Sequence, residues 1–131
     1  MNGREQILNA LRRLNQAENL GPHGSAKQKS LGIDAIMSPD VHGWRNSVFV
    51  PNRQSERDAE RDLFTRCADY HRDFDLIIIE PPQATIGWTI RGTVDGREIV
   101  APGCSIFEFG SDGLVRRYWL YADLTPFAAP R

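Results

Sequence analysis

The sequence predicts an α+β domain in which N-terminal helices pack against a strongly bent antiparallel sheet. Three observations lead to this prediction. Apolar residues recur at helical spacing in the first half of the chain, apolar and polar residues alternate in the second half, and Asp-Gly pairs separate the alternating segments. The 131 residues are the length of one domain with a sizeable core, so we expect a single domain over residues 1–131.

The N-terminal region is expected to hold a helix followed by a loop. Residues 4–19 form an amphipathic helical pattern whose apolar stripe is Ile7, Leu8, Leu11 and Leu14. Residues 21–32 are small and polar with no periodicity, which predicts a mobile loop. All 12 aromatic residues lie beyond residue 43. The first segment is therefore expected to be an aliphatic cover for the aromatic part of the chain.

A second helix is predicted after a short strand. The strand covers residues 44–50 and the helix covers residues 56–72, with Asp62 and Arg66 on its solvated face. Its buried stripe, continued just beyond the helix, is expected to be Ala59, Leu63, Cys67, Tyr70 and Phe74.

The rest of the chain is predicted to be a meander of strands. They are expected at residues 76–79, from residue 84 to the Asp95-Gly96 turn, at residues 97–109 and at residues 114–122. Pro102-Gly103 interrupts the third of these strands and predicts a bulge or bend. The order of helices first and meander second is the basis of the α+β prediction.

The composition argues against several classes of protein. The 16 basic and 17 acidic residues leave a net charge of −1, so no electrostatic footprint for nucleic acid is present. No apolar run approaches the roughly 20 residues of a membrane span. The opening MNGREQILNA lacks the layout of a secretory signal, so we expect a cytoplasmic protein. Three scattered histidines, two cysteines and turn-forming glycines predict neither a metal site nor a phosphate cradle, and we expect no cofactor.

Three segments of the chain resemble the nuclear transport factor 2-like superfamily, in particular its SnoaL-like, polyketide cyclase-like branch. They are SPDV at 38–41, GTVDGREIVAPGCSIFEF at 92–109 and DGLVRRYWLYADLTPF at 112–127. The resemblance implies that the curved sheet forms a cone and that the N-terminal helices close one side of it over a pocket. It does not imply one reaction, because this superfold hosts several enzyme classes and non-enzymes.

Strand parity predicts which side chains face the pocket. The expected ligand-binding residues are Trp44, Asn46, Trp88, Ile90, Ser105, Phe107, Arg116 and Leu120. On the strand at residues 44–50 the alternate parity, which would turn Arg45 inward, remains open. Parity also places apolar groups on the opposite, convex face: Val100, Cys104, Ile106, Val115, Trp119 and Tyr121. In this superfamily the convex face commonly forms a dimer, so we expect a homodimer with Trp119 near the centre of its interface.

Three residues are the candidates for catalysis. Asp123 belongs to a terminal Y-x-D pattern of the family, His42 lies one residue from Asp40, and Tyr118 faces the predicted pocket. The acidic position that SnoaL-like cyclases use on the last strand falls on Leu120 in this sequence. That departure favours a non-catalytic domain of the same fold.

Three functional hypotheses therefore stay open. The first is a general acid/base cyclase or isomerase that acts on an apolar carbonyl compound. The second is a non-catalytic ligand-binding or accessory domain of the same fold. The third is a dimeric domain whose cone is filled by Trp88, Phe107 and Tyr118, and the volume of the cavity separates it from the other two.

Overall fold

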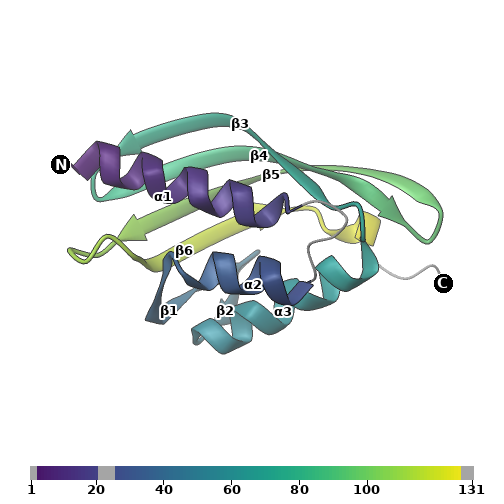
Figure 1. Cartoon of the computed structure of the whole chain (residues 1–131), viewed down its shortest axis with the longest axis horizontal. Helices are drawn as coiled ribbons and strands as arrows, with labels where there is room; N and C mark the ends of the chain where they lie inside the picture. The colour runs from purple at the N-terminus through teal and green to yellow at the C-terminus, as the bar shows by residue number, and fades with distance from the viewer. Residues whose placement is uncertain (1–2, 21–25, 128–131) are drawn as a thin grey trace.

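A six-stranded curved sheet covered on one side by three helices forms the molecule (Figure 1). The computed structural model describes residues 3–20 and 26–127. The helices are α1 (Gly3–Glu18), α2 (Ala26–Asp34), α3 (Arg53–Arg66) and the short 3-10 helix η1 (Thr125–Phe127). The strands are β1 (Met37–Arg45), β2 (Val48–Val50), β3 (His71–Glu80), β4 (Gln83–Val94), β5 (Arg97–Phe109) and β6 (Val115–Ala122). The cone-shaped α+β fold is confirmed.

The sheet is mixed, whereas the sequence predicted an antiparallel one. Its strand order is β2-β1-β6-β5-β4-β3, and β1 pairs with β6 in parallel while all other neighbours are antiparallel. The difference arises because β1 joins the sheet beside the last strand of the chain, a pairing that no local pattern in the sequence reveals.

Among the described residues, no helix is long and apolar enough to cross a membrane.

The three α-helices cover the concave side of the sheet. α1 packs along β3, α3 packs against β1, and α2 lies between α1 and α3 (Figure 1). The predicted loop was wrong for residues 26–32, which belong to α2, and residues 21–25 lie outside the described part of the chain. The loop was predicted because the segment is polar, but its polar Lys29 is buried. The Lys29 ammonium group donates to the backbone oxygens of Glu18 (2.5 Å) and Leu20 (2.9 Å).

α3 turns a different face inward from the one expected. It begins after Asn52, whose side chain accepts a hydrogen bond from the Ser55 N–H, and it ends at Arg66, before the expected residue 72. Its buried residues are Glu56, Glu60 and Phe64, whereas Ala59 of the predicted stripe is exposed. Because one residue corresponds to about 100° around a helix, this small change of register brings two carboxylates into the core.

The predicted bulge at Pro102-Gly103 was also wrong. The β4–β5 register runs without a break from Gln83↔Glu108 to Val94↔Arg97. Gly103 has another role: a side chain there would overlap the Trp88 ring, which lies directly over this glycine. The actual irregularity on this part of the sheet lies between β5 and β6, where Glu108 pairs with Arg117 and Phe109 with Val115. Arg116 is the extra residue of that bulge, so Val115 points inward and is fully buried instead of facing the convex side.

Candidate functional site

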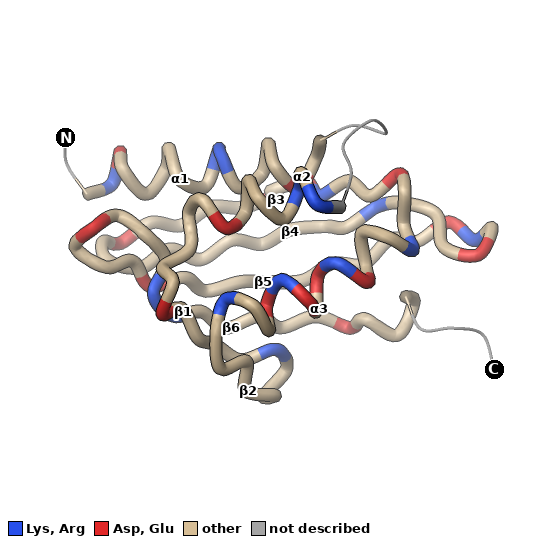
Figure 2. Tube along the Cα trace, turned by 60° about the horizontal axis from the view of Figure 1, so that its bottom comes forward, with Lys and Arg blue, Asp and Glu red and all other residues tan. Residues whose placement is uncertain are grey.

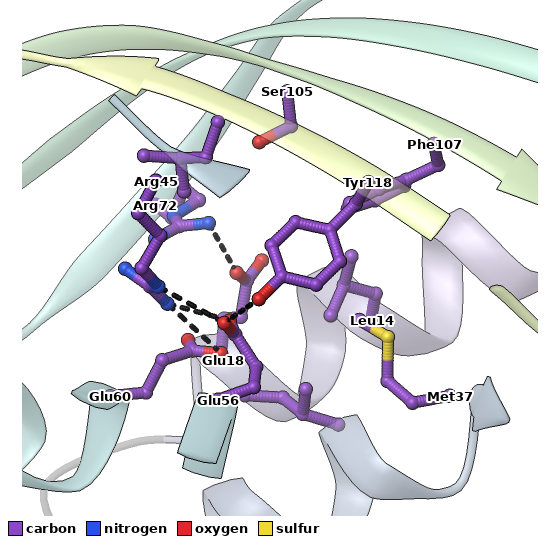
Figure 3. Close-up of a pocket in the computed structure, with 12 residues that line it drawn as sticks. Leu14, Glu18, Met37, Arg45, Glu56, Glu60, Arg72, Ser105, Phe107 and Tyr118 are labelled. Carbon is purple, nitrogen blue, oxygen red and sulfur yellow. Dashed lines mark hydrogen bonds and ion pairs between the residues drawn. The ribbon is translucent and has the colours of Figure 1, made fainter. Parts of the chain in front are cut away.

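A cluster of charged and polar side chains occupies the inside of the cone (Figure 3). It draws on five elements: Glu18 from α1, Arg45 from β1, Glu56 and Glu60 from α3, Arg72 from β3 and Tyr118 from β6. Residues of these types are seldom fully buried without partners, because the loss of water costs charged groups several kcal/mol. The geometry of each group therefore decides what the cluster can do.

One half of the cluster is an ion pair between Arg45 and Glu56. The Arg45 Nε and Nη2 groups donate to the Glu56 carboxylate at 3.0 and 2.6 Å, and the Tyr118 hydroxyl donates to Glu56 Oε2. Burial alone would raise the pKa of Glu56, but the Arg45 charge and these hydrogen bonds lower it to about 2. Burial and the Glu56 charge raise the pKa of Tyr118, so its hydroxyl stays a hydrogen-bond donor.

Glu60 lies one helical turn beyond Glu56, and its pKa is shifted in the opposite direction. Its Oε1 atom is 3.7 Å from the Arg45 Nη2 atom. Burial and the negative charge of Glu56 raise the pKa of Glu60 well above its ordinary value. Two neighbouring carboxyl groups whose pKa values are pushed apart are the arrangement that general acid/base chemistry uses.

The other half of the cluster is an ion pair between Arg72 and Glu18. The Arg72 Nη1 atom lies 2.7 Å from Glu18 Oε2, and the Arg72 guanidinium lies over the Trp88 ring at 4.4 Å from its centroid. Burial raises the pKa of Glu18, although Arg72 opposes this. Within residues 3–20 and 26–127, neither Glu18 Oε1 nor Arg72 Nε has a hydrogen-bond partner. These two buried atoms are available to a water molecule or a ligand.

Ser105 adds a neutral hydroxyl to the same space. It accepts a hydrogen bond from Trp88 Nε1 at 2.9 Å, and both side chains are buried. Because a hydroxyl group both accepts and donates, the Ser105 O–H can still donate a hydrogen bond.

The space left between these side chains is small. The cavity measures about 20 Å³, room for roughly one water molecule. Its apolar walls are formed by Leu14, Ile33, Met37, Phe107 and Leu120. A ligand larger than water therefore requires side chains to move.

Several residues of the predicted ligand-binding and catalytic sets lie at this cavity or next to it. Ser105, Phe107, Tyr118 and Leu120 line it, Trp88 contacts Ser105 and Arg72, and Ile90 is buried on the same face of β4. The alternation along β4, β5 and the end of β6 was enough to find them, because each strand keeps one face inward.

Other predicted site residues lie elsewhere. His42 and Trp44 pack against each other and against Phe49 on the convex side of β1 and β2. Asn46 lies in the β1–β2 turn, where its amide donates to the Ala122 oxygen and accepts from the Ala122 N–H. Arg116 is turned outward by the bulge. β1 thus adopts the alternate parity, with Arg45 inside.

Asp123 lies just beyond β6 and is exposed. Its carboxylate accepts hydrogen bonds from the Thr125 N–H at 3.0 Å and the Thr125 hydroxyl at 2.5 Å. These bonds lower the pKa of Asp123. The structure therefore does not bring Asp123 or His42 together with Tyr118.

The sequence reasoning missed the charged members of the cluster. Glu18, Glu56, Glu60 and Arg72 were not among the predicted site residues, and Arg45 was considered only as the alternate parity of its strand. The Glu56–Glu60–Phe64 spacing was the available signal, since three residues four apart share one helical face. No group of three or more histidine, cysteine, aspartate or glutamate side chains in the described parts of the chain has the geometry of a metal site.

Solved structures with the same fold carry several different activities in their names. A protein from Jannaschia sp. CCS1, proposed to be a SnoaL-like polyketide cyclase, has a TM-score of 0.78 at 17% identity, with 96% of this chain and 94% of that chain covered. AclR from Streptomyces galilaeus, proposed to be a hydroxylase, has a TM-score of 0.79 at 15% identity, with 93% and 92% covered. An LEH-like epoxide hydrolase of M. tuberculosis has a TM-score of 0.70 at 13% identity, with 92% and 84% covered.

Identities this low establish a common fold and leave the reaction open. A search of curated proteins finds no match. The sequence model described as "SnoaL-like domain" matches residues 24–118, which is more than half of the chain. The chain belongs to the SnoaL-like domain family.

Proposed function

We propose that this protein is a small-molecule enzyme that carries out general acid/base chemistry on an apolar carbonyl compound inside the cone. The buried cluster is the observation that supports this: three carboxyl groups, two guanidinium groups and a tyrosine hydroxyl converge on one apolar-walled cavity (Figure 3). Such a cluster is costly to bury, and perturbed carboxyl groups concentrate at functional sites.

Glu18 and Glu60 take the two proton-transfer roles in this proposal. Glu18 keeps a carboxylate oxygen without a partner and has a raised pKa, which suits a base that removes a proton from the carbon next to a carbonyl group. Glu60 holds its proton to higher pH than an ordinary glutamate and donates it to the carbonyl oxygen. The product of both transfers is an enol. Return of a proton to another carbon gives an isomer, and attack of the enol on a second carbonyl gives a ring.

The other polar groups would hold the substrate and the two acids in place. Arg45 and Tyr118 keep Glu56 ionised, and the Glu56 charge keeps Glu60 protonated. Ser105 would orient the carbonyl oxygen with its remaining hydrogen. Met37 lines the cavity and has an unbranched side chain, so its movement is the simplest way to admit a substrate.

Hydrogen–deuterium exchange at the α-carbon of a small cyclic ketone tests this proposal. In deuterated buffer, the chain is expected to accelerate exchange of cyclohexanone by a factor on the order of 10² or more over buffer alone. Glu18→Gln and Glu60→Gln are each expected to remove most of this acceleration, because a carboxamide cannot transfer the proton. Proton NMR of the ketone measures the rate.

Glu108→Gln is the matched control for these two variants. Glu108 bonds Arg116 and Arg117 outside the cavity, so its loss should leave the exchange rate unchanged. Exchange no faster than in buffer, with folded protein and saturating ketone, would contradict the enzymatic proposal.

A non-catalytic ligand-binding or accessory role is the second candidate. The cavity of about 20 Å³ favours the accessory role in particular, because the ion pairs already fill most of the space that a substrate or any other ligand needs. The same experiment separates the two: ketone-induced chemical-shift changes at Ser105 and Tyr118 without accelerated exchange are expected for a binding domain.

We also propose that the convex face of the sheet forms a homodimer. One row of paired residues crosses all six strands on this face: Ile78, Thr85, Ile106, Trp119, Trp44 and Phe49. Trp44 and Trp119 stack with ring centroids 5.4 Å apart, and both Ile78 and Phe49 are more than half exposed. A mostly apolar row that remains partly exposed across a whole sheet is typical of association surfaces.

Replacing Trp119 with aspartate is expected to convert the dimer to a monomer, because it buries a charge at the centre of the proposed interface. Sedimentation velocity at micromolar concentration measures the change. Leu31→Asp serves as the control, since Leu31 is 58% exposed on α2, away from the sheet. A wild-type chain that sediments as a monomer would rule out the dimer.

A cytoplasmic location completes the proposal. Both cysteines are free thiols, Cys67 buried and Cys104 half-buried. Unpaired thiols are usual in the reducing cytosol and uncommon in oxidising compartments.

A further inference from the structure

A second cavity lies between α2 and α3, outside the cone. We call this cavity the α2–α3 hollow. It measures about 270 Å³ and is lined by Lys27, Ser30, Leu31, Arg57 and Arg61. None of these residues lines the cavity inside the cone, so the two spaces are separate. Three of its five lining residues are basic and none is acidic. Figure 2 shows basic residues at the start of α2 and along α3.

α3 itself sorts its charges by direction. It contains four arginines and four acidic residues, so it carries no net charge as a whole. Glu56 and Glu60 turn into the cone, Asp62 pairs with Arg66, and Asp58 accepts a hydrogen bond from Gln54. Arg57 and Arg61 are left facing α2. Like charges four residues apart on a helix repel each other, and Asp34 offsets the charge of Arg57 but not that of Arg61.

The charges in the hollow are only partly compensated. Arg57 forms an ion pair with Asp34 and donates to Gln54 Oε1, which fixes its guanidinium group. Lys27 and Arg61 have no ion-pair partner among the described side chains. The hollow therefore carries two uncompensated positive charges.

Two polar atoms of the lining residues also lack partners. Ser30 is about 5% exposed, and neither its hydroxyl oxygen nor Arg57 Nε has a hydrogen-bond partner within the described segments. Unpartnered buried donors are uncommon in folded proteins and usually meet a ligand or ordered water. A rotation of the Ser30 hydroxyl is the smallest movement that brings a donor to an occupant of the hollow.

We propose that the α2–α3 hollow binds a phosphate group. A phosphate monoester carries close to two negative charges at neutral pH, which matches the two free cations, and its tetrahedral oxygens accept several hydrogen bonds at once. Arg61 and Lys27 supply the charge, Ser30 supplies a neutral donor, and the Arg57–Asp34 pair holds the floor of the site in place. A carboxylate ligand would leave one of the two charges uncompensated.

Titration of the full chain with inorganic phosphate tests the proposal. At pH about 7.5 and constant ionic strength, saturable shifts of the Ser30 and Arg61 amide signals are expected by NMR. Arg61→Ala and Lys27→Ala should each weaken binding about tenfold, since each removes one charge-assisted contact. Sulfate, a dianion over the whole range, should bind equally at pH about 5.5 and 7.5, whereas phosphate should bind more weakly at the lower pH.

Arg12→Ala is the control, because Arg12 is an exposed arginine on α1 and its loss changes the net charge by the same amount. Its affinity for phosphate should stay within about twofold of the wild type. A second titration with glycerol 2-phosphate distinguishes a site for free phosphate from a site for a phosphate ester. If the site takes esters, glycerol 2-phosphate should bind at least as tightly as inorganic phosphate. Non-saturable shifts, or equal losses in Arg61→Ala and Arg12→Ala, would overturn the proposal.

Discussion

Replacing Arg72 with methionine is expected to lower the free energy of unfolding by about 3–5 kcal/mol. The change leaves the carboxylate of Glu18, which is 1% exposed, without its cation 2.7 Å away. It also removes the guanidinium that lies over Trp88. Urea denaturation at pH about 7 measures the loss. Because burial already raises the pKa of Glu18, the loss should be smaller at lower pH, where Glu18 takes up a proton.

Arg91→Met is the control for this prediction. Arg91 pairs with Asp73 at 3.2 Å, but both side chains are largely exposed, and such pairs contribute about 0–1 kcal/mol. The double variant Glu18→Gln with Arg72→Met should regain part of the stability, because it removes the buried charge as well as its partner. Equal effects of Arg72→Met and Arg91→Met would contradict the buried ion pair.

Acidification is expected to reduce the stability through Glu56 by on the order of 3 kcal/mol. The pKa of Glu56 falls from an ordinary 4.5 to about 2 in the folded chain. A depressed folded pKa means that this contribution is fully present above pH 4.5 and is lost as the pH falls through about 2. Urea unfolding at a series of pH values measures it, and Glu56→Gln should show a correspondingly flatter acid limb.

Glu60 should change the free energy of unfolding with pH in the opposite direction from Glu56. Its pKa is raised in the folded chain, so its contribution is present below the ordinary value of 4.5 and declines as the pH rises above it. Glu60→Gln should therefore stabilise the chain relative to wild type at pH about 8 and have little effect at pH about 4. A Glu60→Gln variant that is less stable than wild type at both values would contradict a protonated Glu60.

The strands and turns that follow from a short-range sequence pattern were predictable from the sequence. β5 was expected at its observed bounds, and the Asp95-Gly96 turn has both residues at positive φ, as a two-residue hairpin requires. The bulge at Arg116 was not predictable, because nothing in VRRYW indicates which residue leaves the ladder. That one residue decides whether Val115 or Arg116 faces the core.

The candidate site was harder to predict than the fold for a physical reason. Pattern reading assigns charged residues to the surface, since isolated charges are too costly to bury. Here Arg45 and Arg72 offset the buried carboxylates of Glu56 and Glu18, and each pair joins elements far apart in the sequence or on different layers. Such pairing becomes visible only when the tertiary structure is known.

The parallel pairing of β1 with β6 has a consequence for how the chain folds during synthesis. β1 pairs with β2 next to it in the chain, but its parallel partner β6 comes about 75 residues later, and the Asn46 side-chain amide bonds the backbone of Ala122 at the end of β6. Until residue 122 leaves the ribosome, β1 and the α3 carboxylates above it have no complete surface to pack on. The meander β3–β4–β5, whose contacts are local, should therefore form first, and the polar cluster should assemble in the final and slowest step.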